Sequence, residues 1–126
     1  MQENELSKII LDVAFNIHKE LGPGLLESVY EEVMFYELKN ECGLYVQRQE
    51  SIPVVWKKVR MELGFRADLI VENEVLVELK SVETLAAVHP KQVLTYLKLT
   101  GLKLGMLLNF NEALLKNGIK RIVNNL

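Results

Sequence analysis

Two carboxylates and a lysine, Asp68, Glu78 and Lys80, are spaced so that a short hairpin could bring them together at one end of a sheet, where two carboxylates could bind a cation. Residues 75–80, with the sequence VLVELK, are expected to form a strand, and strand residues two positions apart point to the same face. Glu78 and Lys80 therefore project side by side. The same tripeptide at 37–39 lies in an expected helix, where positions two apart point about 200° apart around the axis. We interpret that copy as a solvated helix surface.

A hairpin is expected to bring Asp68 beside this pair. If its turn consists of three residues, 72–74, Asp68 lies opposite Glu78, with the two Cβ atoms about 5 Å apart. A two-residue turn would oppose Asp68 to Leu79 instead and place the carboxylates on opposite faces. Two carboxylates this close repel each other unless one is protonated or a cation lies between them, and Mg²⁺ is the usual cation. The alternative interpretation is a surface salt-bridge cluster at the end of a sheet.

Apolar periodicity and turn residues predict the elements that position these side chains. The order is α-α-β-β-β-β-α-β-β, which predicts an α/β fold with a mixed sheet flanked by helices. The expected helices cover 4–21, 25–41 and 82–99, and the expected strands cover 44–53, 59–65, 67–71, 75–80, 104–110 and 119–125. The passage from residue 75 to residue 108 is expected to connect two parallel strands through a helix.

The first two expected strands carry further signals. Pro53 predicts an edge position or a strand junction, because proline has no N–H to donate to a neighbouring strand. Alternation of apolar residues in 59–65 predicts one buried face. Lys57, Lys58 and Arg60 are expected on an exposed hairpin, and the sequence assigns no role to Trp56.

The 126 residues fit one domain, 1–126, of ordinary globular composition, with 49% apolar and 25% charged residues. Cys42 is the only cysteine, which excludes an intramolecular disulfide and a cysteine-based zinc or iron–sulfur site. No apolar run reaches the roughly 20 residues of a membrane span. The polar start MQENELSK is not that of a secretory signal. We therefore expect a cytoplasmic protein.

The net charge of −2 argues against binding by a broad basic field. It leaves room for an enzyme that meets nucleic acid through bound metal ions and a local basic stripe. Other enzyme classes fit less well, because the sequence has no glycine-rich phosphate loop, no serine-centred nucleophile motif, and few histidines and cysteines.

Three motifs carry a resemblance to a known family. Asp68 followed by Glu78-Leu79-Lys80 resembles the PD-(D/E)XK nuclease signature, with Ala67 in place of the proline. GLLESVY, residues 24–30, looks like the Gly-x-x-Glu-x-x-Tyr motif of the GxxExxY protein family. QVLTY, residues 92–96, looks like the Gln-x-x-x-Tyr helix motif of the recombination-exonuclease branch of the superfamily. The resemblance covers nearly the whole chain, with its motifs in the right order.

The resemblance implies a restriction-endonuclease-like core with a metal-dependent phosphodiesterase site. Asp68 and Glu78 would be the principal Mg²⁺ or Mn²⁺ ligands, with the Leu79 backbone carbonyl as a further ligand. Lys80 would orient the attacking water or stabilise developing charge. Glu27 would be a further catalytic acid that binds the metal or a water; the alternative is a carboxylate that complements the dipole of its helix.

The resemblance also implies roles for the third helix. Gln92 and Tyr96, four positions apart, share one helix face. Gln92 would steady the site or the substrate, and Tyr96 would reach a phosphate or stack on a base. Helix packing with a polar edge is the alternative. We expect His89, Arg66 and Lys91 to contact the substrate. The alternatives are a structural role for His89 and a solvent-exposed helix face for Lys91.

These observations predict a metal-dependent nuclease that hydrolyses phosphodiester bonds of nucleic acid, with DNA favoured over RNA. The alternative is a catalytically inactive module of the same fold that binds nucleic acid or protein. A homodimer is a further hypothesis, because a compact nuclease gains grip on its substrate by dimerising.

Overall fold

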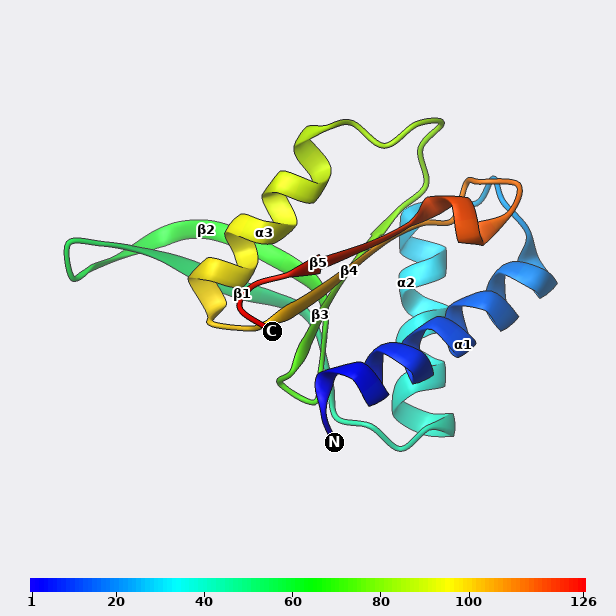
Figure 1. The fold of residues 1–126 in the computed structure, drawn as a ribbon, viewed down its shortest axis with the longest axis horizontal. Helices are drawn as coiled ribbons and strands as arrows, with labels where there is room; N and C mark the ends of the chain where they lie inside the picture. Colours follow the sequence, from blue (N-terminus) through cyan, green and yellow to red (C-terminus); the bar gives the residue numbers. More distant parts are fainter.

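A mixed sheet of five strands, in the order β1-β2-β3-β4-β5, forms the centre of the computed structural model (Figure 1). The structure describes residues 1–126 apart from the side chains of Glu62 and Leu63. The pairs β1–β2, β2–β3 and β4–β5 are antiparallel, whereas β3 and β4 are parallel. The predicted α/β fold with a mixed sheet is therefore confirmed, and β1 and β5 are the edge strands.

The elements follow one another as predicted, with one difference. Their bounds are α1 Glu3–Leu21, α2 Glu27–Tyr36 with a π-helical continuation η1 Glu37–Glu41, β1 Val46–Trp56, β2 Val59–Val71, β3 Val75–Lys80, α3 Val88–Thr100, β4 Leu104–Asn109, a 3-10 turn η2 Leu115–Gly118, and β5 Ile119–Val123. The strands expected at 59–65 and 67–71 form one continuous β2, because Arg66 between them keeps its pairing with Ser51. Within the described part of the chain, no helix has the length and apolar character that a membrane crossing requires.

The third helix begins later than expected, at Val88 rather than Val82. The reason lies in Asn109, a fully buried residue at the end of β4. Its Oδ1 accepts a hydrogen bond from the Val82 N–H (3.1 Å), and its Nδ2 donates to the Val82 carbonyl (2.9 Å). These two bonds tie residue 82 to the sheet, so its backbone groups are not available to a helix.

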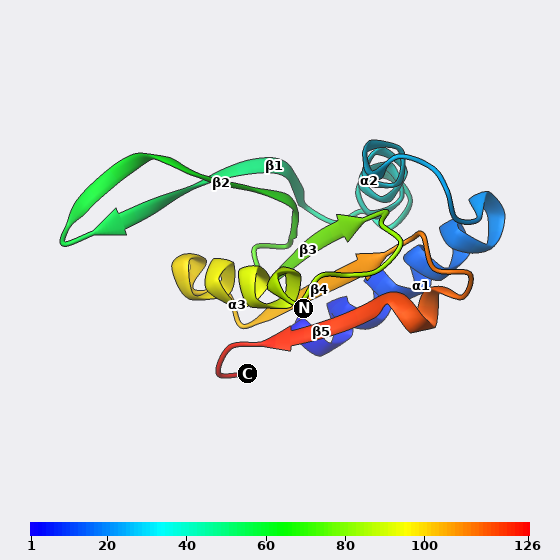
Figure 2. The same cartoon turned by 90° about the horizontal axis from the view of Figure 1, so that it is seen from above.

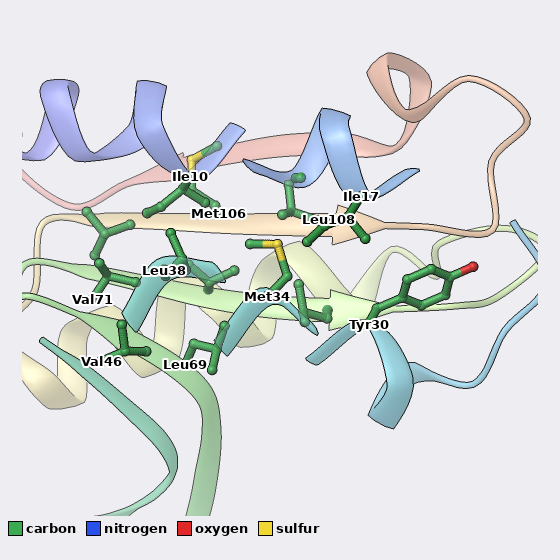
Figure 3. Packing of buried hydrophobic residues seen from close by; sticks show 14 of the residues in the cluster. Ile10, Ile17, Tyr30, Met34, Leu38, Val46, Leu69, Val71, Met106 and Leu108 are labelled. Carbon is green, nitrogen blue, oxygen red and sulfur yellow. The ribbon is translucent and has the colours of Figure 1, made fainter. Parts of the chain in front are cut away.

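Apolar side chains cover both faces of the sheet. On one face α1 and α2 pack on the strands in a large core, whose labelled members in Figure 3 are Ile10, Ile17, Tyr30, Met34, Leu38, Val46, Leu69, Val71, Met106 and Leu108. On the other face α3 packs in a smaller core formed by Ala67, Ile70, Leu76, Val93, Leu97 and Leu107. β4 is buried along its whole length, as its uninterrupted apolar sequence predicted.

β1 and β2 continue beyond the sheet as a two-stranded ribbon, residues 51–65, which we call the arm (Figures 1 and 2). Pro53 lies in this edge strand, as predicted, next to a shift in the pairing register. The predicted buried face is wrong for Val59 and Met61, which are exposed, because no helix covers the ribbon where it leaves the sheet. The same prediction for Leu63 lies outside the described residues.

Gly105 generates a prediction about the packing of α3. A Cβ atom at this position would lie 2.6 Å from Cγ1 of Val93, which is buried in the smaller core. Valine has little rotamer freedom in a helix and cannot turn away. We expect Gly105→Ala to lower the free energy of unfolding by about 1–3 kcal/mol in urea denaturation. In a Val93→Ala background the same substitution should cost much less; an equal cost in both backgrounds would contradict this contact.

Candidate active site

The turn between β2 and β3 sets the register of the candidate site. Val71 pairs with Val75 and Leu69 with Val77, so the turn has the three residues 72–74 on which the prediction depended. Glu72 and Asn73 both take left-handed conformations, each with φ of 53°. The backbone pairs end at Leu69 and Val77, and continuing their register by one residue brings Asp68 opposite Glu78; both residues line the same pocket. The predicted pairing of the hairpin is confirmed.

Most of the predicted site residues line one pocket between the sheet and α3. Glu78 and Lys80 come from β3, and Asp68 comes from β2 beside them. α3 closes the pocket from above the sheet. The lining residues are Arg66, Asp68, Glu78, Lys80, His89, Gln92 and Tyr96, with Val93 and Leu107 as the apolar part.

Glu78 is the most unusual group in the pocket. Its side chain is only 7% exposed, and its Oε1 atom has no hydrogen-bond partner among the described residues. Burial, and then the negative charge of Asp68, raises the pKa of Glu78 to about 9, against an opposing contribution from Lys80. A carboxyl group in this position holds a proton or needs a cation.

Asp68 is oriented by hydrogen bonds to both of its oxygens. Oδ2 accepts from the Leu79 backbone N–H (2.9 Å), and Oδ1 accepts from Nε2 of Gln49 (3.2 Å). The amide of Leu79 thus points toward β2. Because the N–H and C=O of one strand residue point to the same side, the Leu79 carbonyl faces the space beside Asp68 as well.

These groups fit a hard divalent cation. Two carboxylates and a backbone carbonyl are oxygen ligands, and the unpartnered Oε1 of Glu78 supplies a free ligand atom. Among the described residues, no group of three or more His, Cys, Asp or Glu side chains is placed to hold a metal. An ion at Asp68 and Glu78 would therefore complete its coordination with water or with substrate oxygens, as Mg²⁺ commonly does.

α3 contributes Gln92 and Tyr96 to the pocket, as their shared helix face predicted. The Tyr96 ring stacks on Phe65 of β2, with centroids 3.5 Å apart and an angle of 8° between the planes. Burial, followed by the charges of Glu78 and Asp68, raises the pKa of Tyr96. The phenol therefore keeps its proton and can donate a hydrogen bond.

His89 is held at the start of α3, where its Nδ1 accepts from the Ala86 N–H (3.2 Å). Lys91 is exposed on α3 outside the pocket lining.

The structure does not bring Glu27 into this pocket. Glu27 begins α2 as an exposed residue and lines a separate depression together with Ser81. Its expected role in the metal site stays a prediction.

Tyr30 of the same motif is fully buried; its hydroxyl donates to the Gly22 carbonyl (2.5 Å) and accepts from the Leu25 N–H (3.2 Å). This tyrosine holds the loop before α2 in shape.

That loop in turn contacts the end of β3. Ser81, directly after Lys80, donates its hydroxyl to the Leu25 carbonyl (2.6 Å). The Gly-x-x-Glu-x-x-Tyr segment thus supports the strand that carries Glu78 and Lys80 from the opposite face of the sheet.

Sequence reasoning missed a second polar connection from α2. Glu31 is buried, and its Oε1 accepts from Nε2 of Gln49 (2.6 Å), the same nitrogen that reaches Asp68. Arg48 pairs with the other oxygen of Glu31 (2.8 Å). Glu31 lies four residues after Glu27 and so on the same helix face, which was the available signal. Gln49 gave none, because its left-handed φ of 52° inside β1 is not visible in the sequence.

Comparison with known proteins agrees with this geometry. A family model described as the PD-(D/E)XK nuclease superfamily matches residues 4–122 of the chain. Comparisons with curated proteins and with solved structures gave no match.

The raised pKa of Glu78 predicts an unusual pH dependence of stability in the metal-free protein. Between the ordinary pKa of 4.5 and about 9, the folded state keeps the Glu78 proton and the unfolded state loses it. The free energy of unfolding should therefore fall as pH rises through this window, by up to about 1.4 kcal/mol per pH unit from this group.

Urea denaturation in EDTA at several pH values between 6 and 8 measures this slope. Glu78→Gln, which cannot ionise, should flatten it and should be more stable than the parent at pH 8. Glu83→Gln, a change at an exposed glutamate, serves as the matched control and should keep the parent slope. An unchanged slope in Glu78→Gln would contradict the buried protonated carboxyl.

Proposed function

Because this chain belongs to the PD-(D/E)XK nuclease superfamily, we propose that it is a metal-dependent nuclease that hydrolyses phosphodiester bonds, with DNA as the favoured substrate. The observation that carries the proposal is the buried, unpartnered Glu78 carboxylate opposite Asp68 at the end of β3, with Lys80 on the same face. A structural salt bridge would pair its charges within the protein. Here a carboxylate oxygen remains without a partner, which suits an ion that arrives from solution.

Asp68, Glu78 and the Leu79 carbonyl would hold Mg²⁺ or Mn²⁺. When bound, such an ion lowers the pKa of a bound water and neutralises phosphate charge. The hydrogen bonds from Leu79 and Gln49 fix the Asp68 carboxylate in one orientation, so that it need not reorganise when the ion enters.

The remaining lining residues would act on water and substrate. Lys80 lies beside Glu78 on the same strand face and carries its positive charge next to the position of the reacting phosphate, where it orients the nucleophile or offsets developing charge. Gln92 offers an amide from α3 to a water or a phosphate oxygen. Tyr96 donates a hydrogen bond from its phenol to the substrate, and Arg66 and His89 contact flanking phosphates.

A binding module without catalysis is the second candidate. The observation that favours it is that, among the described side chains, the pocket contains two carboxylates, Asp68 and Glu78, with Glu27 outside it. Both candidates would bind nucleic acid, but only the nuclease would cleave it, so a cleavage assay distinguishes them.

The nuclease proposal predicts that single-stranded or double-stranded DNA or RNA oligonucleotides are cut in Mg²⁺ or Mn²⁺ and remain intact in EDTA. Asp68→Asn and Lys80→Ala should each reduce the cleavage rate by roughly a hundredfold or more, since each removes a group aimed at the reacting centre. Asp12→Asn and Lys8→Ala, at exposed positions of α1, make the same chemical changes away from the pocket and should cut at the parent rate. Equal cleavage by the Asp68 and Lys80 variants would exclude catalysis at this site.

Metal binding can be measured without cleavage. Calorimetric titration with Mn²⁺ should show binding that tightens as pH rises, because the ion displaces the Glu78 proton. Glu78→Gln should abolish this binding, and Glu83→Gln should retain it. Metal binding without cleavage of any of the four polymers would favour the binding module over the nuclease.

A further inference from the structure

We propose that the arm, residues 51–65, is a nucleic-acid contact that engages the polymer away from the reacting phosphodiester. This inference rests on the proposed function, because it takes nucleic acid as the ligand of the pocket. It assigns a role to Trp56, Lys57, Lys58 and Arg60, which the pocket does not use.

The arm concentrates positive charge on an acidic protein. Residues 51–65 contain three of the 15 lysines and arginines of the chain and one of its 17 acidic residues. Lys57 and Lys58 form the turn at the tip, and Arg60 follows on β2; all three are exposed. A polymer of phosphates matches this local charge, whereas the net charge of −2 gives no attraction from the molecule as a whole.

The backbone of the turn at the tip is strained at both of its residues. Lys57 and Lys58 have φ of 49° and 69°, the left-handed region that a two-residue hairpin turn of this hand requires. Asparagine and glycine fill such positions with less strain. Two lysines at these positions are not what the turn geometry favours, which is consistent with a role for their side chains in binding.

The arm also presents an apolar face beside these charges. Trp56 pairs with Val59 at the tip, and cross-strand partners share a face. Their exposed fractions are 63% and 56%, which is unusual for side chains of this size. The Trp56 ring lies under the Lys57 ammonium, 5.7 Å from its centroid, and its remaining surface is open. An exposed indole next to lysines is the combination that stacks on bases while the neighbouring charges bind phosphates.

The arm is continuous with the pocket through a single strand. Along β2, Arg60 near the tip leads to Phe65, which stacks on Tyr96, then to Arg66 and Asp68 of the pocket lining. Both views show the arm extending away from the helices α1 and α2 (Figures 1 and 2). Eight strand residues, less the local irregularity of the pairing, span roughly 20–25 Å. A ligand must therefore extend about six to seven base pairs from Asp68 to reach Arg60, and further to reach the lysines at the tip.

Trp56 is the only tryptophan of the chain, so its fluorescence reports on the arm directly. The protein is titrated in EDTA, which prevents cleavage. The probes are oligonucleotides of 3 and of about 16 nucleotides, both single-stranded and duplex. We expect the longer ligands to change the Trp56 emission and the trinucleotide to leave it unchanged. An emission that no ligand alters would overturn the proposal.

The charges are tested by fluorescence anisotropy of the labelled 16-residue ligand that binds most tightly. The triple variant Lys57→Ala, Lys58→Ala, Arg60→Ala should bind it at least tenfold more weakly at 100 mM salt. The slope of log affinity against log salt should become shallower by about 2 to 3, as expected for three lost phosphate contacts. Trp56→Ala should weaken binding fivefold or more, and Trp56→Phe should restore part of it.

The matched control is the triple variant Lys8→Ala, Lys19→Ala, Lys116→Ala, which removes the same charge from exposed positions of α1 and η2. It should bind the long ligand within twofold of the parent. An equal loss of affinity in both triple variants would show that binding depends on total charge and not on the arm, and would overturn the proposal. So would a change of mass in light scattering on substitution of Trp56, which would identify the apolar face as a contact between copies of the chain.

The readouts keep this inference distinct from the proposed function. Failure of the nuclease shows as uncut polymer with the Trp56 response intact. If the proposal for the arm is wrong, the protein still cleaves nucleic acid or binds metal, but the arm variants bind long ligands as tightly as the parent does.

Discussion

The opposition of Asp68 and Glu78 across the β2–β3 hairpin is the constraint on which the site depends. The three-residue turn sets this register, and β3 is buried from both sides, so the Glu78 carboxylate is held out of water next to another acid. Its raised pKa and its unpartnered oxygen are two consequences of the same placement. A protein that needed only stability would place an apolar residue there, since an unpaired buried carboxyl opposes folding. A bound cation would offset this cost, which is how the architecture of the sheet bears on the proposed metal-dependent chemistry.

Several separate segments hold the end of β3 in place around this pair. Asn109 of β4 binds the backbone of Val82, Ser81 binds the Leu25 carbonyl, and Leu79 donates to Asp68. Tyr30 keeps the loop at Leu25 in shape from the other side of the sheet. The chain thus surrounds Asp68 and Glu78 with hydrogen bonds to the backbone, which fix these two positions more firmly than contacts between long side chains would. In this light the tyrosine of the Gly-x-x-Glu-x-x-Tyr segment is a structural residue, and membership of the narrower GxxExxY family stays a prediction.

Two of the pocket's neighbours connect it to the rest of the molecule. Gln49 joins Asp68 to the buried Glu31 of α2, so that helix supports the site through a side-chain amide. Phe65 joins Tyr96 to the base of the arm. The first connection reaches into the large core, and the second leads outward along β2 toward the exposed tip. The pocket therefore involves the part of β2 that directly follows the arm. Figure 1 shows the arm as a long projection of the sheet.

The sequence by itself determined the properties that follow from local periodicity. Alternation along a strand put Glu78 and Lys80 on one face, a turn of the right length put Asp68 opposite them, and proline marked the edge strand. The superfamily followed from these residues and their order. Only the tertiary structure decided the rest: that Glu78 is buried without a partner, that Gln49 rather than Glu27 reaches Asp68, and that residues 59–61 leave the sheet uncovered. Each of these depends on which distant segments pack together, and burial and hydrogen-bond partners are properties of that packing and not of any window of the sequence.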